Sequence, residues 1–140
     1  MTTVAHTASY WHATHNDIVH CDLCPHACVI APGRRGICGV RENRAGTLVT
    51  LNYGVACSAH LDPIEKKPLY HFFPGSQIVS IGTYGCNLSC QWCQNYSISK
   101  EFSTSVLRQN LTPELLLDAV EGHARGHALH EMCGVAYTYN

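Results

Sequence analysis

Three cysteines near the middle of the chain, Cys86, Cys90 and Cys93, have the spacing C-x3-C-x2-C. Three thiolates this close together can bind three irons of a cubane iron–sulfur cluster. The fourth iron would then lack a protein ligand, and an open coordination position allows a metal site to bind and activate a substrate. A cluster held by four cysteines carries electrons instead. The spacing therefore indicates a site that does chemistry on a bound molecule.

A structural zinc ion is the alternative for these thiolates, with a fourth ligand supplied from elsewhere in the chain. Soft thiolates select zinc and iron–sulfur clusters alike over hard ions, so the spacing alone does not separate the two. The apolar segment 77–83, directly before the loop, is predicted to be a strand. Folds that alternate strands and helices place active sites after such strands, and this context favours the cluster.

A second group of cysteines precedes the first and has the spacing C-x2-C-x3-C-x9-C. Its members are Cys21, Cys24, Cys28 and Cys38. Four thiolates suffice for a closed tetrahedral zinc site, or for a fully ligated iron or iron–sulfur site. A structural metal site is our main interpretation. A second iron–sulfur cluster that relays electrons, and free thiols, are the alternatives.

The composition limits which classes of protein are compatible with the chain. It has 140 residues and a net charge of −1, so no basic excess indicates nucleic-acid binding. Its apolar stretches are too short to span a membrane, and the N-terminus lacks a signal-peptide pattern. Nine cysteines, an odd number, are more often metal ligands than disulfides in a reducing compartment. We therefore expect a cytoplasmic metal-binding protein.

The elements that position these cysteines can be predicted in outline. Residues 48–57 are rich in β-branched side chains and predict a strand. Thr112 followed by Pro113 is a typical helix start, and apolar spacing predicts a helix from about 113 to 125. Residues 134–139 predict another strand. Strand, helix and strand in this order imply a parallel βαβ unit.

The sequence resembles a known family, the radical S-adenosylmethionine superfamily. The resemblance is carried by the Cys86–Cys93 loop, with Trp92 directly before its last cysteine. Longer stretches narrow it to the radical enzyme of the AmmeMemoRadiSam system, a relative of pyruvate formate-lyase activating enzymes. These stretches are Cys21-x2-Cys24-Pro25-His26-x-Cys28, Gly36-x-Cys38-Gly39-Val40-Arg41, Asp62 to His71, and Gly82 to Leu88. The resemblance runs from about residue 19 to the last residue.

This resemblance implies a cofactor set and a reaction. Cys86, Cys90 and Cys93 would bind a 4Fe–4S cluster, and S-adenosylmethionine would chelate the open iron with Trp92 near its adenine. The reaction implied is reductive cleavage to a 5′-deoxyadenosyl radical, which abstracts hydrogen from a substrate that the sequence does not identify and that could be a protein. An electron donor such as flavodoxin or ferredoxin is also implied. Zinc or a second iron–sulfur site is expected at the N-terminal cysteines.

The fold expected on these grounds is α/β, an incomplete radical S-adenosylmethionine (βα) barrel with only its first βαβ unit. We expect a flexible arm at 1–20, a Cys-rich segment with strands at 21–76, and the truncated start of the barrel at 77–140. Members of the family are more than twice this length, so an N-terminal fragment is expected, and whether it is active is open. A non-catalytic zinc or iron–sulfur binding module is the alternative function.

Two further polar groups have two interpretations each. Asp62, Glu65, Lys66, Lys67 and His71 form a dense motif that either faces an active site or is a solvated loop. His123, His127 and His130 have helical spacing that can bind a metal, although an exposed helix end carrying histidines is favoured.

Overall fold

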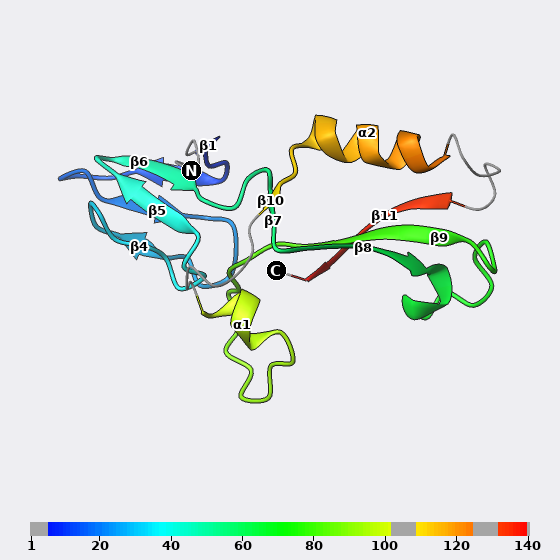
Figure 1. The fold of residues 1–140 in the computed structure, drawn as a ribbon. Helices are drawn as coiled ribbons and strands as arrows, with labels where there is room; N and C mark the ends of the chain where they lie inside the picture. Colours follow the sequence, from blue (N-terminus) through cyan, green and yellow to red (C-terminus); the bar gives the residue numbers. More distant parts are fainter. Residues whose placement is uncertain (1–5, 102–108, 125–131, 140) are drawn as a thin grey trace. The chain divides into compact units, whose positions relative to one another are not determined.

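The computed structural model describes residues 6–101, 109–124 and 132–139, and Figure 1 shows their arrangement into strands and helices. The predicted α/β fold with an incomplete barrel is wrong. The described residues form mostly small β-sheets, with 35% of them in strands and 15% in helices. The physical reason is that turns with left-handed backbone, such as those at Gly33, Gly39 and Gly46, interrupt the N-terminal half every few residues. Only short antiparallel pairs fit between them.

The chain divides into two compact units, and the division differs from the predicted segments. One unit contains the described residues of 1–53 and 84–104, and the other those of 54–83 and 105–140. The Cys86–Cys93 loop therefore belongs to the same unit as the N-terminal cysteines. Among the described residues, no helix is long and apolar enough to cross a membrane.

The first unit is built from two small antiparallel sheets. One has the order β2-β3-β4, and the other has the order β1-β6-β5. The strands are β1 (His6–Thr7), β2 (Trp11–Ala13), β3 (Val19–Cys21), β4 (Val29–Ile30), β5 (Arg41–Arg44) and β6 (Thr47–Thr50). A helix of one turn, α1 (Tyr96–Ser99), follows the Cys86–Cys93 loop.

The core of this unit takes side chains from strands of both sheets. Its buried members are Ala8, Val19, Cys21, Ile30 and Leu48, with Trp11 and Cys28 packed against them. Ala8 and Trp11 come from the stretch that we predicted to be a flexible arm. The part of that stretch from His6 onward forms strands because these apolar side chains are buried against the rest of the unit.

The second unit contains a three-stranded sheet of order β11-β9-β8. Its strands are β8 (Ser58–Pro63), β9 (Gln77–Gly82) and β11 (Met132–Tyr139). β11 is parallel to β9, whereas β8 is antiparallel to it. This antiparallel neighbour makes the sheet mixed, which is not the arrangement of a parallel barrel. β7 (Val55–Ala56) and β10 (Gln109–Asn110) form a separate antiparallel pair, and a 3₁₀ helix, η1 (Ile64–Lys66), follows β8.

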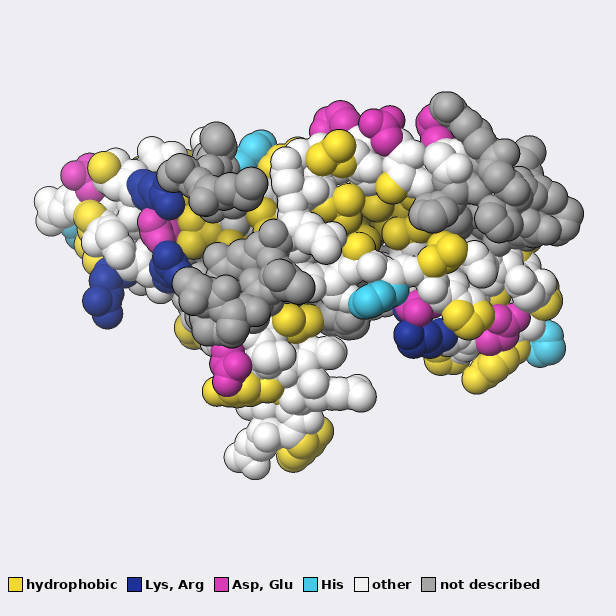
Figure 2. All heavy atoms as spheres, viewed as in Figure 1, with side chains coloured by type: hydrophobic (Ala, Val, Ile, Leu, Met, Phe, Trp, Pro, Cys, Tyr) yellow, Lys and Arg dark blue, Asp and Glu magenta, His cyan; other side chains and the backbone are white. Residues whose placement is uncertain are grey.

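The helix α2 (Pro113–Ala124) begins where the sequence predicts, and its start explains why. The Leu115 amide donates to Thr112 Oγ1 at 3.4 Å, so the threonine acts as the N-cap. Leu116 of the helix packs on Val79 and Ile81 of β9 to form the core of this unit. Figure 2 shows apolar side chains gathered between α2 and the sheet.

The side chain of Asn43 in β5 forms hydrogen bonds to three separate segments of the first unit. Its side chain is fully buried, and its Nδ2 donates to the carbonyl oxygens of Asp17 and Ile30, each at 2.7 Å. Its Oδ1 accepts a hydrogen bond from the Gly46 amide at 2.9 Å. All the polar atoms of the side chain are therefore used in a place that excludes water.

Replacing this side chain is expected to destabilise the first unit strongly. Asn43→Ala leaves the buried Ile30 carbonyl, the part-buried Asp17 carbonyl and the Gly46 amide without this partner, which costs about 3 kcal/mol of unfolding free energy. Thr47→Ala, an exposed change on the neighbouring strand β6, should cost less than about 0.5 kcal/mol. Denaturant unfolding of both variants measures the difference. Equal stability of the two would contradict the role given to Asn43.

Candidate functional site

The Cys86–Cys93 loop begins at a glycine that has no room for a side chain. Gly85 has φ +89°, a conformation that other residues rarely adopt. A Cβ built there would lie 2.3 Å from Val40 Cγ1 and 2.9 Å from the carbonyl oxygen of Cys38. Directly before it, the buried Tyr84 donates its hydroxyl hydrogen bond to the Leu51 carbonyl. The loop is thus held closely against the segment that carries Cys38.

The other end of the loop is held by the residues of α1 and just after it. Lys100 Nζ donates to the Cys86 carbonyl at 2.8 Å, which ties the chain after α1 back to the first cysteine. Ser99 is buried, and its Oγ lies 3.4 Å from Cys93 Sγ. The Leu88 amide donates to Cys86 Sγ at 3.4 Å. Hydrogen bonds to cysteine sulfur are among the interactions that tune iron–sulfur sites.

The middle of the loop faces solvent. Cys90 is exposed, Cys86 and Cys93 are half-buried, and the Trp92 side chain is 86% exposed. No disulfide involves any of the three cysteines. A molecule in solution can therefore reach this part of the loop without moving other residues of the unit.

The spacing of the three sulfurs can be compared with the spacing that a zinc ion and an iron–sulfur cluster require. A single tetrahedral zinc ion with Zn–S bonds of about 2.3 Å requires sulfurs about 4 Å apart. Among the described residues, the three sulfurs are not a group whose atoms all lie within 4.8 Å of one another. In an iron–sulfur cluster each cysteine binds a different iron, so its sulfurs are held farther apart. The three thiols are thus not arranged around a single ion in this structure, and thiolate donors as such suit zinc and iron–sulfur clusters alike.

The N-terminal cysteines have different surroundings from one another. Cys21 is only 5% exposed, belongs to the apolar core, and accepts a hydrogen bond from Arg41 Nη1 at 3.5 Å. Cys24 and Cys28 lie in the turn between β3 and β4, where both are partly exposed. Within the part of the chain that the structure describes, no three of Cys21, Cys24, Cys28 and Cys38 come within single-ion distance. Strand alternation explains why Cys21 is buried, because its side chain points inward from β3.

The two cysteine groups meet through a histidine. His26 Nε2 donates to the carbonyl oxygen of Asn87 at 2.7 Å, and Asn87 directly follows Cys86. His26 is exposed, and the 60 residues between it and Asn87 explain why no local sequence signal indicated this contact. Together with the close packing of Gly85, it places both groups side by side within one unit.

The polar motif that begins at Asp62 pairs mainly with itself, in the second unit. Asp62 is buried at the end of β8, and its two oxygens accept hydrogen bonds from Lys66 Nζ at 2.7 Å and Lys67 Nζ at 2.9 Å. The Lys66 ammonium, with Lys67 beside it, holds the pKa of Asp62 well below its usual range. Glu65 accepts from the Gly75 amide at 2.7 Å. These contacts shape the connection between β8 and β9.

Of the three helix-end histidines, His127 and His130 lie outside the described residues, and the side chain of His123 is not described either. Cys133 in β11 is half-buried, and its Sγ lies 3.3 Å from the Gln77 carbonyl of β9. Cys57, between β7 and β8, is also half-buried.

Comparison with known proteins gives one relative. The chain is 39% identical over 133 residues to an uncharacterized protein of Methanocaldococcus jannaschii. The match covers 94% of the chain but only 38% of the length of that relative. No family model matches the chain. No solved structure matches it. The radical S-adenosylmethionine resemblance therefore stays a prediction.

The contact at Gly85 gives a prediction with a matched control. Gly85→Ala places an alanine in a left-handed backbone conformation and brings its Cβ into a clash with Val40 and Cys38. The substitution should cost about 3 kcal/mol or more of unfolding free energy. Gly33→Ala, at φ +73° with nothing within 4 Å of its Cβ, should cost about 1 kcal/mol. Denaturant unfolding compares them. A Gly85 variant no less stable than the Gly33 variant would refute the close packing.

The ion pair at Asp62 predicts a dependence of stability on pH. The pKa of Asp62 is lower in the folded state than the usual unfolded value of about 3.9. Its contribution is therefore present above that value and is lost as the pH falls through the folded-state pKa. The difference in unfolding free energy between wild type and Asp62→Asn should be largest near neutral pH and shrink below about pH 4. Denaturant unfolding at several pH values measures it.

The control for that series is Asp118→Asn, which removes an exposed carboxylate from α2 in the same unit. Its stability should follow the wild-type pH profile closely. A constant difference between wild type and Asp62→Asn down to pH 2 would show that the pair contributes nothing through its charge.

Proposed function

We propose that this chain carries the cluster-binding part of a radical S-adenosylmethionine enzyme, with Cys86, Cys90 and Cys93 as the ligands of a 4Fe–4S cluster. The observation that carries the proposal is the C-x3-C-x2-C loop, whose three thiols form no disulfide and whose Cys90 and Trp92 face solvent. The cluster, when bound, would supply the electron that cleaves S-adenosylmethionine to a 5′-deoxyadenosyl radical.

The chain's own residues would bind and orient the cofactors. Cys86, Cys90 and Cys93 would each bind one iron, and the fourth iron would have no protein ligand. Gly85 and Lys100 fix the two ends of the loop, so that the cysteines keep their relative positions. Trp92, exposed beside the last cysteine, is available to contact the adenine of S-adenosylmethionine.

The partners in this proposal are an electron donor such as flavodoxin or ferredoxin and a substrate that could be a protein. Because clustered cysteines are more often metal ligands than disulfide partners in a reducing compartment, the proposal includes a cytoplasmic location. The chain spans 38% of its relative's length.

A non-catalytic zinc or iron–sulfur binding module is the second candidate. The observation that favours it is that all seven motif cysteines lie in one compact unit. In such a module Cys24, Cys28 and Cys38 would add structural ligands beside the loop. Metal analysis of aerobically purified protein separates the candidates, because stoichiometric zinc without sulfide supports the module alone.

Anaerobic reconstitution tests the first proposal. Wild-type protein should bind about four irons and four sulfides at this loop. Cys86→Ala, Cys90→Ala and Cys93→Ala together should abolish that cluster, whereas Cys133→Ala, in the second unit, should retain it. The electron paramagnetic resonance signal of the reduced protein should change when S-adenosylmethionine is added, because only an open iron can bind it.

The N-terminal cysteines require their own control, since they could bind a cluster as well. The measurement is therefore repeated with Cys24, Cys28 and Cys38 replaced by serine. If the iron–sulfur spectrum persists after both sets have been replaced, or if S-adenosylmethionine leaves the signal unchanged, the assignment is wrong.

A further inference from the structure

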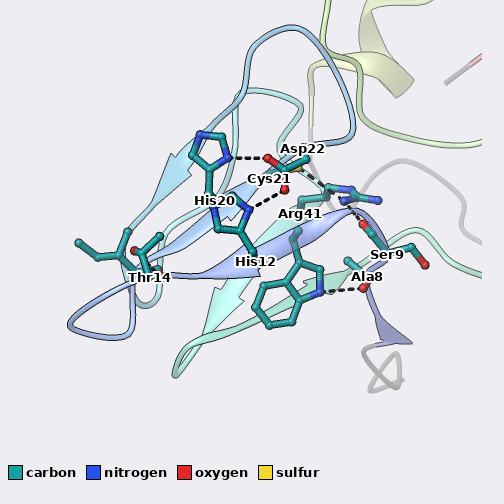
Figure 3. A network of polar contacts seen from close by, with 10 residues as sticks. Ala8, Ser9, His12, Thr14, His20, Cys21, Asp22 and Arg41 are labelled. Carbon is teal, nitrogen blue, oxygen red and sulfur yellow. Dashed lines mark hydrogen bonds and ion pairs between the residues drawn. The ribbon is translucent and has the colours of Figure 1, made fainter.

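A second type of potential ligand lies on one face of β2 and β3. His12, His20 and Asp22 each offer one ligand atom, and these atoms all lie within 4.8 Å of one another. Figure 3 shows both imidazole rings turned toward the Asp22 carboxylate. It is the one such group of three in the part of the chain that the structure describes.

The strand register brings these residues together. His12 of β2 is the direct partner of His20 of β3 in the antiparallel pair. Asp22 is two residues beyond His20, so it lies on the same face of the sheet. The Asp22 amide donates to the Tyr10 carbonyl at 2.9 Å, which continues the pairing past the end of β3. Three side chains are thereby fixed on one face by backbone hydrogen bonds.

The distances among the side chains are short. His12 Nδ1 lies 2.8 Å from Asp22 Oδ2, and His20 Nδ1 lies 2.7 Å from Asp22 Oδ1. The two rings are stacked, with centroids 4.9 Å apart and planes 25° apart. Ligands of a tetrahedral zinc ion with bonds of about 2.0 Å are about 3.3 Å apart. Small movements therefore bring nitrogen and oxygen atoms to zinc-binding distances.

We propose that His12, His20 and Asp22 form a zinc site. Two imidazole nitrogens and one carboxylate oxygen are a donor set that binds zinc and leaves one coordination position for water. The side chains are 58%, 28% and 43% exposed, in that order, so this position faces solvent. Cys21, although it lies between His20 and Asp22 in sequence, is excluded because it points into the core.

The site differs in chemistry from the cysteine sites and does not depend on them. Imidazole and carboxylate ligands suit zinc, whereas thiolates also suit iron–sulfur clusters. An ordinary hydrogen-bonded His–Asp–His group is the competing explanation of the same geometry. In a zinc site, added Zn²⁺ binds a ring nitrogen, Nδ1 or Nε2, of both His12 and His20. In a group that is only hydrogen-bonded, added Zn²⁺ binds neither ring.

Titration of the reduced chain with Zn²⁺, followed by nitrogen NMR of the histidine side chains, tests the proposal directly. The imidazole resonances of His12 and His20 should shift together, and the shifts should reach their limit when one Zn²⁺ ion is bound at this site. Those of His15, an exposed residue in the turn between the two strands, should not shift. Shifts spread equally over all exposed histidines, or none at His12 and His20, would overturn the site.

Variants provide the second measurement. His12→Ala, His20→Ala and Asp22→Asn should each weaken this Zn²⁺ site by about tenfold or more. His15→Ala is the matched control and should bind as the wild type does. Co²⁺ distinguishes this site from the cysteines, because only thiolate ligands give sulfur-to-cobalt charge-transfer absorption. The proposal fails if the three variants bind Zn²⁺ as the wild type does; if a variant does not fold, the wild-type NMR titration decides.

Discussion

The close approach of Gly85 to Val40 and the Cys38 carbonyl is the contact on which the cysteine loop depends. It leaves no space for a side chain, so the backbone of the loop lies directly against the N-terminal segment. Gly85, Val40 and Cys38 all belong to the first unit, so the contact fixes the start of the loop within that unit. The His26–Asn87 hydrogen bond and the Lys100–Cys86 hydrogen bond then fix the direction in which the loop leaves this contact.

The sequence predicted the local elements well where a local signal exists. Thr112 and Pro113 predicted the start of α2, and the structure confirms it through the bond from the Leu115 amide to Thr112 Oγ1. The apolar segment 77–83 predicted the strand β9, whose residues 78–82 are all buried. Such signals depend on side chains a few residues apart, which is why they can be read without knowing the rest of the fold.

The fold class could not be predicted in the same way. The antiparallel partner of β9 is β8, and that pairing depends on how the η1 connection folds around the Asp62 ion pair. Likewise, the cluster of His12, His20 and Asp22 depends on the register of β2 against β3. The x-His-x-Asp alternation at residues 20 and 22 was visible in the sequence, but nothing local indicated that His12 would be the third member.

Strand alternation also explains why one short segment can serve two kinds of chemistry. In β3 and just after it, His20 and Asp22 point outward while Cys21 points into the core. The spacing C-x2-C-x3-C treats Cys21 as equivalent to Cys24 and Cys28, yet the strand removes it from solvent and gives it Arg41 as a neighbour. The accessible N-terminal thiols are then Cys24, Cys28 and Cys38, on the side of the unit that meets the loop at Gly85 and Asn87. Soft sulfur ligands and the nitrogen and oxygen ligands of His12, His20 and Asp22 are thus kept in separate places, so a thiolate-bound cluster and a zinc ion need not compete for the same donors.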